Sequence, residues 1–348
     1  MVGRPGRANC HIDDSFAAPP ARYLCTLMRY ALSDARAWVR ANLRGYFVAG
    51  YTPFLPNGDI DEPALRRNVR ATLAKPGVGG LSLHTIHQEF WSFTPDERRR
   101  VTEIVLEEAA GRAPVVVNVS DPAARNAVAY ARHAKAAGAD AVMLWPPVYG
   151  PRTAAGVRAY YEAVAEGIDI GFFAYSTTLA ELGFHLDAAQ VEALLPIPHL
   201  CGVQVTSSLA NYGDMLERVG DRVCVTTSLE ETLLHGHRQF PQRAVRFTLG
   251  SSRPLLVQTA AHPHCGRFMA ALLRGELEEA GRQQQIVAAL AETLQSRYFA
   301  RGFHHVALFK RVAGLLGLET HGLRPALAEP EPAELAECVA VLKAAGLL

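Results

Sequence analysis

Residues 115–145 read VVVNVSDPAARNAVAYARHAKAAGADAVMLW, and this stretch contains one complete repeat of the fold that the sequence predicts. Val115–Val119 and Ala141–Trp145 are short β-rich runs, and Asp121-Pro122 between them is a helix start opened by proline. Short β-rich runs that alternate with longer helical ones are typical of βα units on a parallel sheet. The stretch therefore predicts a strand, a helix and a second, parallel strand.

The same alternation continues in both directions from this repeat, starting at Gly45. An eighth strand should follow the seventh, and two segments qualify for it, Ala244–Leu249 and Leu255–Thr259. We favour Leu255–Thr259, which leaves Arg238–Arg253 as an insertion. The expected fold is a (β/α)8 TIM barrel of the α/β class, with a C-terminal helical appendage. The first seven predicted strands are Tyr46–Tyr51, Gly80–His84, Val115–Val119, Ala141–Trp145, Ile170–Tyr175, Gly202–Thr206 and Val223–Thr226.

Helix signals complete the predicted organisation. Thr94-Pro95-Asp96-Glu97 is a capping box with proline at the first helical position, and Ser228 to Glu231 repeats the box. Residues 1–43 are expected to form an N-terminal extension, partly disordered, with one short helix over Ala35–Leu43. Residues 44–265 would form the barrel and residues 266–348 a C-terminal helical region. That region contains three predicted helices, Glu276–Arg297, Phe303–Leu316 and Pro332–Ala345.

The composition narrows the classes of partner. The chain has 348 residues, of which 49% are hydrophobic and 20% charged, and its formal net charge is +1. Because no run of Lys or Arg stands out, we expect neither nucleic acid nor a membrane as partner, and instead a small molecule or further copies of the chain. The six cysteines show no CxxC spacing and no secretory signal is evident, which favours a reducing cytoplasm.

Several short motifs recur along the chain in a fixed order. Together they resemble the dihydrodipicolinate synthase and N-acetylneuraminate lyase family, from Gly45 to about Pro325. The resemblance implies a (β/α)8 barrel, a small-molecule substrate and a catalytic tyrosine at Tyr175, which closes the fifth strand. The matching segments are Thr52-Pro53-Phe54, Asn57–Asp61, Glu89, Phe93-Thr94, Glu97-Arg98, Gly138–Ala141, Pro146–Tyr149, Tyr175, Lys310, Leu315–Gly317 and Arg324-Pro325.

The sixth strand departs from this family at its central residue. Family members present an imine-forming lysine there, whereas this chain reads Gly202-Val203-Gln204-Val205-Thr206-Ser207. Glutamine cannot form an imine, because an amine nucleophile must be a lysine. None of the four lysines of this chain is expected at a position where it could replace the imine-forming lysine. The four are Lys75, Lys135, Lys310 and Lys343.

Two further departures concern groups that handle the substrate in the family. The loop that carries two threonines in the family reads Thr85-Ile86-His87-Gln88-Glu89 here, so Ile86 and His87 replace those threonines. The arginine that holds a substrate carboxylate in the synthases is absent from the segment 176–181. We therefore expect that the chain does not handle a 2-oxo acid through an imine.

The candidate site lies where the barrel strands end, since catalytic groups of such barrels sit at their C-terminal face. The candidate catalytic residues are Tyr175, His87 and Tyr149, and the candidate substrate-binding residues are Gln204, His84, Glu89, Asn118 and His262. We expect no metal and no cofactor, although the HxxH pattern of His84 and His87 also fits metal ligands or structural hydrogen bonding. Tyr175 could also only line the barrel, Tyr149 could anchor a turn, and Gln204 could fill the space left by the lysine.

Two hypotheses about function follow. In the first, the chain is a lyase or hydratase that acts on a carbonyl-containing small molecule by acid/base chemistry without an imine. Tyr175 and His87 would be the acid and base, and Gln204 would polarise the carbonyl. In the second, the chain is a catalytically inactive barrel that binds a metabolite or serves as an oligomerisation partner. The titratable and hydrogen-bonding replacements His87 and Gln204 favour the first.

The loop after the fourth strand bears on assembly. In the synthases the tyrosine that matches Tyr149 reaches across a subunit interface, and the segment Trp145–Tyr149 carries more apolar area than a solvated loop needs. We therefore expect a homodimer or homotetramer with this segment close to the contact.

Overall fold

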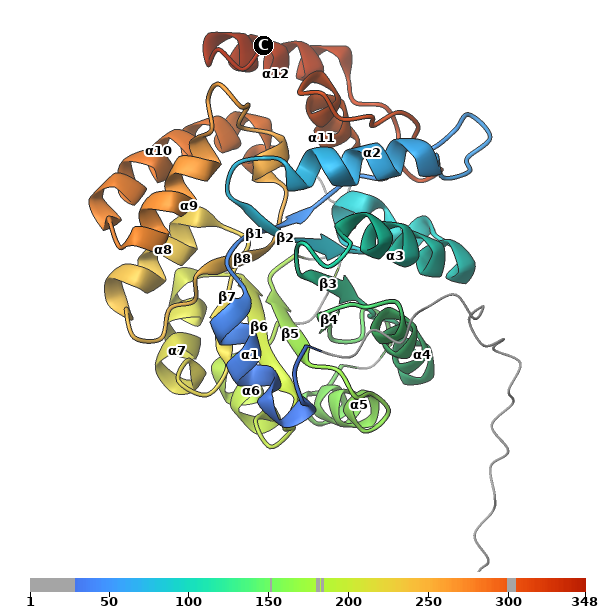
Figure 1. Cartoon of the computed structure of the whole chain (residues 1–348), viewed down its shortest axis with the longest axis vertical. Helices are drawn as coiled ribbons and strands as arrows, with labels where there is room; N and C mark the ends of the chain where they lie inside the picture. Colours follow the sequence, from blue (N-terminus) through green and yellow to red (C-terminus); the bar gives the residue numbers. More distant parts are fainter. Residues whose placement is uncertain (1–28, 151, 180–181, 183–184, 299–304) are drawn as a thin grey trace, which may run out of the picture.

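The computed structural model describes residues 29–150, 152–179, 182, 185–298 and 305–348. The predicted disorder of the N-terminal extension concerns residues that lie almost entirely outside this part of the chain. The short helix expected there is α1 (Ala35–Asn42), which lies across the N-terminal end of the barrel in Figure 1. Arg40 of α1 donates hydrogen bonds to the carbonyls of Gly220 and Val223 at 2.7 and 2.9 Å, and these bonds attach the helix to the barrel.

Eight parallel strands form the central sheet, in the order β7-β6-β5-β4-β3-β2-β1-β8. Between the two outer strands, the Thr226 hydroxyl donates to the Phe247 carbonyl at 2.7 Å and the Leu249 amide donates to the Thr227 carbonyl at 2.9 Å. The strands therefore form a nearly closed (β/α)8 barrel, as expected. They are β1 (Gly45–Ala49), β2 (Val78–Leu83), β3 (Val115–Asn118), β4 (Ala141–Leu144), β5 (Phe172–Thr177), β6 (Leu200–Thr206), β7 (Cys224–Thr226) and β8 (Phe247–Ser251).

The preferred eighth strand was wrong. Phe247–Ser251 pairs in parallel with β1, and the ring of Phe247 packs inside the barrel against Phe47 and Phe173, with centroids 5.8 and 6.1 Å away. Leu255–Thr259 is not a strand: it begins in the short 3-10 helix η5 (Arg253–Leu255), and the amides of Leu256 and Val257 donate back to the Arg253 carbonyl at 2.9 and 3.0 Å. The segment is apolar because it is buried, and the supposed insertion contains the true strand.

A ring of helices surrounds the strands (Figure 1). The capping box predicted at Thr94 is confirmed at the start of α3, whereas the N-cap residues of α4 and α8 are Ala123 and Leu229, which make no side-chain cap bond. The box predicted at Ser228 was therefore wrong. The ring helices are α2 (Glu62–Leu73), α3 (Pro95–Ala109), α4 (Ala124–Ala136), α5 (Ala154–Glu166), α6 (Ala188–Leu194), α7 (Leu209–Val219) and α8 (Glu230–Gln239).

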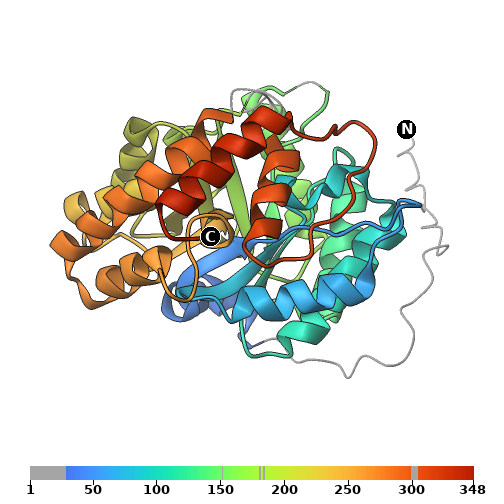
Figure 2. The ribbon, with the colours of Figure 1, turned by 90° about the horizontal axis from the view of Figure 1, so that it is seen from above.

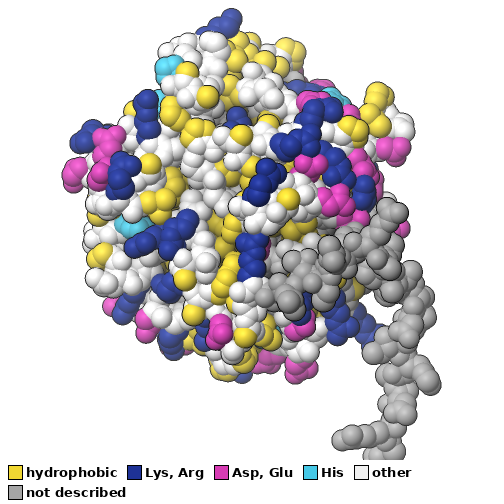
Figure 3. All heavy atoms as spheres, viewed as in Figure 1, with side chains coloured by type: hydrophobic (Ala, Val, Ile, Leu, Met, Phe, Trp, Pro, Cys, Tyr) yellow, Lys and Arg dark blue, Asp and Glu magenta, His cyan; other side chains and the backbone are white. Residues whose placement is uncertain are grey.

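The remaining helices follow β8. They are α9 (His264–Arg274), α10 (Leu277–Leu294), α11 (His305–Leu315) and α12 (Pro332–Ala344). Figure 2 shows α11 and α12, in red, lying across one side of the barrel beside α10. The three helices predicted for the C-terminal region correspond to α10, α11 and α12, and the division of the chain at residue 265 stays a prediction. On the face shown in Figure 3, basic and acidic side chains are interspersed.

Candidate functional site

A cavity of about 60 Å³ lies at the C-terminal ends of the strands, where the fold predicts a site. It is small, since it has room for only a few water molecules. Its lining comes mainly from β2 to β6 and from the loops that follow them. The lining residues are Ser82, Thr85, Ile86, His87, Asn118, Met143, Trp145, Tyr175, Leu179, Gln204, Thr206, Ser228 and Gly250.

Tyr175 and Gln204 lie side by side on neighbouring strands, because the register of β5 and β6 pairs these two residues. The Tyr175 ring packs against Trp145, with the ring centroids 5.3 Å apart. Burial raises the pKa of the Tyr175 phenol, and the adjacent hydroxyls of Thr177 and Thr206 oppose that rise, so the phenol is neutral at pH 7. Tyr175 therefore presents a neutral phenol to the cavity.

The Gln204 amide makes no hydrogen bond with another residue in the described part of the chain, although its side chain is only 7% exposed. Its neighbour on β8 is Gly250, which has a φ of +79°. A Cβ atom at that position would lie 3.1 Å from Gln204 Nε2, so glycine leaves the amide its space. One donor and one acceptor of the amide are therefore available to a ligand.

His87 lies in an aromatic environment at the edge of the cavity. Its ring stacks on Phe309 at 6.0 Å and lies edge-on to Tyr51 and His305 at 6.2 and 5.9 Å. Both ring nitrogens are buried without a hydrogen-bond partner among the described residues. Burial, followed by the charge repulsion of His305, lowers the pKa of His87 to about 3, so its imidazole is neutral at pH 7.

Asn118 lines the same cavity, but its polar atoms are already bonded. Its Nδ2 donates to the His84 carbonyl at 2.8 Å, and its Oδ1 accepts from the amide and the hydroxyl of Ser120 at 3.0 and 2.5 Å. Arg98 on α3 donates a hydrogen bond to the Asn118 carbonyl at 2.7 Å. These bonds hold the end of β3 in place and leave Asn118 little capacity for a substrate.

His84 and Glu89 do not line the cavity, contrary to the expected binding roles. His84 has a φ of +54°, and its Nε2 lies 2.8 Å from the hydroxyl of Thr102 on α3, so the ring is directed into the helix layer. Glu89 accepts a hydrogen bond from Lys310 Nζ at 2.6 Å in a fully buried ion pair. Lys310 Nζ also donates to the carbonyls of Thr52 and Gly322, so all three of its donors are used.

Tyr149 and His262 also lie outside the cavity. Tyr149 is 85% exposed. His262 follows Gln258, which donates to the carbonyl of Pro76 just before β2, so His262 lies at the opposite end of the barrel. Its expected role depended on the misplaced eighth strand. Trp145 is buried against Tyr175 rather than on the surface, so the apolar patch predicted for segment 145–149 is reduced mainly to Tyr149.

Several residues that line the cavity or lie beside it were not among the candidate site residues that the sequence predicted. Thr177 and Thr206 flank the Tyr175 phenol, and Trp145 and Met143 form an apolar wall. Alternation along the strands could have indicated them, because residues two apart on a strand share a face: Thr177 follows Tyr175, Thr206 follows Gln204, and Trp145 follows Met143.

No group of three or more metal-ligating side chains is found among the described residues. No helix in the described ranges is both long enough and apolar enough to cross a membrane.

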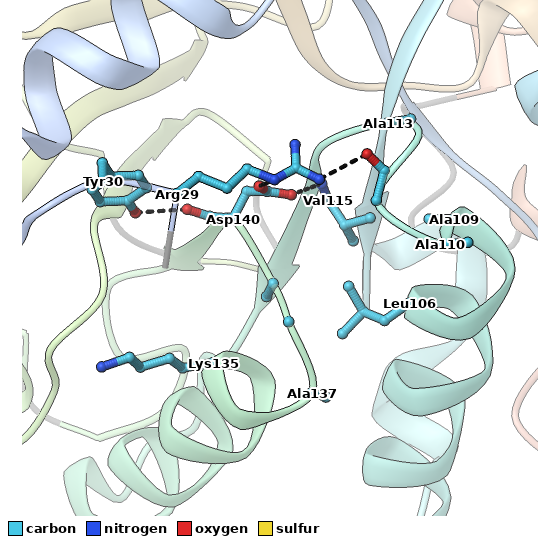
Figure 4. Close-up of a pocket in the computed structure, with 13 residues that line it drawn as sticks. Arg29, Tyr30, Leu106, Ala109, Ala110, Ala113, Val115, Lys135, Ala137 and Asp140 are labelled. Atoms are coloured by element: carbon cyan, nitrogen blue, oxygen red, sulfur yellow. Dashed lines mark hydrogen bonds and ion pairs between the residues drawn. The ribbon is translucent and has the colours of Figure 1, made fainter. Parts of the chain in front are cut away.

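A larger cavity of about 300 Å³ lies at the other end of the barrel (Figure 4). Here the Tyr30 hydroxyl donates to the Asp140 carbonyl at 2.6 Å, and Asp140 pairs with Arg29 and accepts from the Val115 amide. Burial raises the pKa of Asp140, and both the Val115 amide and Arg29 oppose that rise. The polar groups of this cavity bind one another, and it lies away from the strand ends where barrel enzymes act.

Comparison with known proteins agrees with this architecture. Residues 42–345 match the model of the dihydrodipicolinate synthetase family. The 4-hydroxy-tetrahydrodipicolinate synthase of Acidiphilium cryptum is 29% identical over 307 residues, which cover 87% of this chain and 99% of that protein. The corresponding enzyme of Pelobacter propionicus is 27% identical, with 88% and 99% covered.

Solved structures show the same fold. A putative dihydrodipicolinate synthetase from Pseudomonas aeruginosa superposes with a TM-score of 0.76 at 22% identity, covering 87% of this chain and 99% of that one. An N-acetylneuraminate lyase from Mycoplasma synoviae gives a TM-score of 0.72 at 17% identity, with 87% and 98% covered. The chain belongs to the dihydrodipicolinate synthetase family, a family of aldolase-type lyases.

Proposed function

We propose that this chain is a lyase or hydratase that acts on a small carbonyl compound without forming an imine. The observation that carries the proposal is the pair Tyr175 and Gln204, which face one buried cavity from paired positions on β5 and β6. Gln204 stands where the resemblance expects the imine-forming lysine, and its amide has a free donor. A carbonyl oxygen in the cavity would accept hydrogen bonds from that amide and from the Tyr175 phenol.

Tyr175 acts as the acid in this proposal. Negative charge that develops on the substrate oxygen during bond cleavage or addition is stabilised by the Gln204 amide and neutralised by the proton of the Tyr175 phenol. Because the cavity is buried, these hydrogen bonds act in a low dielectric, where they are stronger than in water.

His87 accepts the proton that leaves the substrate. With a pKa of about 3, the free imidazole is a weak base. Negative charge that develops on the substrate oxygen, before the Tyr175 proton neutralises it, favours the protonated form of a nearby imidazole, so His87 is a stronger base in the transition state than in the free protein. The two unpartnered ring nitrogens give His87 an acceptor in its neutral form.

Three further properties of the proposed enzyme are its location, its independence of a metal or cofactor, and its assembly. We propose that it works in the cytoplasm without a metal or cofactor, as a homo-oligomer. The exposed Tyr149 supports the assembly, because an aromatic ring at 85% exposure leaves apolar surface for a second copy to cover. The other candidate residues, His84, Glu89, Asn118 and His262, have no direct substrate contact in this proposal.

Hydrogen exchange tests the proposed function across a panel of candidate substrates. The panel consists of small aldehydes, ketones and 2-oxo acids, each incubated with the protein in deuterated water. Proton NMR measures the exchange of carbon-bound hydrogens, and at least one compound should exchange faster than the background without protein. Tyr175→Phe should slow that exchange by about 100-fold or more, as expected for loss of an acid catalyst. Tyr161→Phe is the matched control, since the Tyr161 hydroxyl donates to the Leu144 carbonyl outside the cavity. Exchange of no compound above background would support the catalytically inactive barrel instead.

A further inference from the structure

We infer that His305 is a proton relay, which carries the proton that His87 takes from the substrate to water outside the barrel. The inference rests on the proposed function, in which His87 accepts that proton, and deepens it by naming the route by which the base is reset. His305 lies in α11, the helix that crosses one side of the barrel beside α12 (Figure 2).

His87 needs such a route because its ring nitrogens have no exposed surface. Both nitrogens are buried. The ring borders the cavity at the strand ends, and a bound substrate would fill the volume of about 60 Å³ that this cavity offers. A proton on His87 therefore cannot leave through the cavity while the site is occupied. It has to pass to a neighbouring side chain.

Three rings pack on the His87 imidazole, and one of the three is a base. Phe309 has no group that accepts a proton. Burial raises the pKa of the Tyr51 phenol, so this phenol keeps its proton and accepts no second one at neutral pH. His305 presents an imidazole, whose ring centroid lies 5.9 Å from that of His87 with the planes at 67°. Two rings at this separation are in contact.

His305 also lines a second cavity, which we call the outer cavity. It is bounded by α11, by the start of α12 and by Tyr298 after α10, and its volume of about 160 Å³ has room for several water molecules. The His305 side chain is only 3% exposed. Because His87 borders the cavity at the strand ends and His305 borders the outer cavity, the two touching rings connect the two cavities.

The charges around the pair favour movement of the proton outward. The charged side chains in the described lining of the outer cavity are the carboxylates Glu329, Glu331 and Glu334, of which Glu329 also pairs with Arg311 on α11. Negative charge near an imidazole favours its protonated form, so a proton is more stable on His305 than deeper in the barrel.

The pair also carries no more than one proton. Burial, followed by the charge repulsion of His305, lowers the pKa of His87 to about 3. Two touching imidazoles do not both hold a positive charge at neutral pH, because like charges repel. His305 must therefore be neutral when His87 takes the proton of the substrate, and is then able to accept it.

The transfer moves one proton and no electrons. The bond between the proton and a ring nitrogen of His87 breaks, and a bond to a ring nitrogen of His305 forms, within hydrogen-bond reach or through one water molecule. An imidazole can bind a proton at one nitrogen and release one from the other. His305 then gives a proton to water in the outer cavity, and both rings return to the neutral form.

Exchange of the His87 ring hydrogen with water tests the relay without any substrate. The neutral imidazole carries one ring hydrogen, and its exchange requires one proton to arrive and another to leave. In protein with isotope-labelled histidine, NMR measures this rate by magnetisation transfer from water, and the signal is identified by its loss in His87→Phe. The rate should fall about tenfold or more in His305→Phe, which keeps an aromatic ring in place, and in His305→Gln. The matched control His262→Gln, at the opposite end of the barrel, should leave it unchanged.

Added imidazole gives a second readout, which a purely structural role of His305 would not produce. His305→Ala leaves space beside the outer cavity, and imidazole in that space can carry the proton in place of the missing ring. Millimolar imidazole should therefore restore the exchange rate of His305→Ala towards that of the unmodified protein and should leave the His262→Gln control unchanged.

The outcomes separate the relay from the proposed reaction. Unchanged or faster exchange in whichever of His305→Phe and His305→Gln folds would overturn the relay, because loosened packing alone admits water and speeds exchange. Slower exchange in these variants, with no compound of the substrate panel exchanging, would support the relay and contradict the proposed reaction. If a compound does exchange, its exchange should slow in the same variants, and an unchanged rate would overturn the role of His305 in resetting His87.

Discussion

Two sets of buried polar groups lie at the same end of this barrel and differ in how their hydrogen bonds are used. Around Glu89 and Lys310, each ammonium hydrogen has a protein acceptor. Around Tyr175, Gln204 and His87, an amide and two ring nitrogens have none among the described residues. Both sets are almost fully buried, so burial does not distinguish them. A candidate site differs from a structural ion pair because it has buried donors and acceptors without a protein partner.

Removal of a charge from the paired set should have the largest effect on stability. Lys310→Met leaves the Glu89 carboxylate buried without its partner, which costs about 3–5 kcal/mol of the free energy of unfolding. Urea denaturation measures this loss. Lys343→Met on the surface of α12 is the control and should change stability by about 0.5 kcal/mol or less. A loss below about 1 kcal/mol for Lys310→Met would show that the ion pair is not structural.

Two amides that line the same cavity offer a closer comparison. Asn118→Leu should cost about 2–3 kcal/mol, because it breaks the bonds to His84 and Ser120 and leaves buried partners unsatisfied. Gln204→Leu should cost about 1 kcal/mol or less, because the amide has no protein bond to lose. Thermal and urea unfolding measure both. Equal losses for the two variants would contradict the distinction between used and free hydrogen bonds.

The unpartnered imidazole of His87 should make the fold sensitive to acid. Its pKa is 6.5 when unfolded and about 3 when folded, so the unfolded chain binds more protons between these values and stability falls as the pH falls. From about pH 7 to about pH 5 this group removes about 2 kcal/mol. His87→Phe should reduce the loss of unfolding free energy between pH 7 and pH 5 by about 2 kcal/mol. Any strain from the larger ring is independent of pH and does not change this difference.

The matched control for His87 is the exposed His185. His185→Gln should leave the pH dependence of unfolding close to that of the unmodified protein. If His87→Phe leaves it unchanged as well, the His87 ring is not held neutral by burial.

The smallest expected effect on stability concerns Tyr149. Tyr149→Ser should change the stability of the folded subunit by about 0.5 kcal/mol or less, because the side chain is exposed. It should weaken self-association, measured by sedimentation velocity at micromolar concentration. Sedimentation of the unmodified protein as a single chain would refute the homo-oligomer, and Tyr149 would then have no partner subunit to contact.

The sequence predicted the barrel, its first seven strands and the cavity residues His87, Asn118, Tyr175 and Gln204. It preferred the wrong candidate for β8, because Leu255–Thr259 is as apolar as a strand although it is buried beside helices, whereas the other candidate, Ala244–Leu249, overlaps β8. The sequence also placed the His84 side chain wrongly. A positive φ at His84 directs the side chain toward α3, and the alternation of side chains along a strand does not predict a positive φ. Glu89 was expected to bind substrate because its partner in the ion pair, Lys310, lies 221 residues further along the chain.

The loss of the imine-forming amine is the claim on which the proposed function depends. The most direct measurement is intact-protein mass spectrometry after incubation with pyruvate and borohydride, which reduces an imine to a stable adduct. The unmodified protein should show no increase in mass, because Gln204 cannot form an imine and the ammonium of Lys310 is bound by three acceptors. A stoichiometric adduct of one reduced pyruvate per chain would contradict the account.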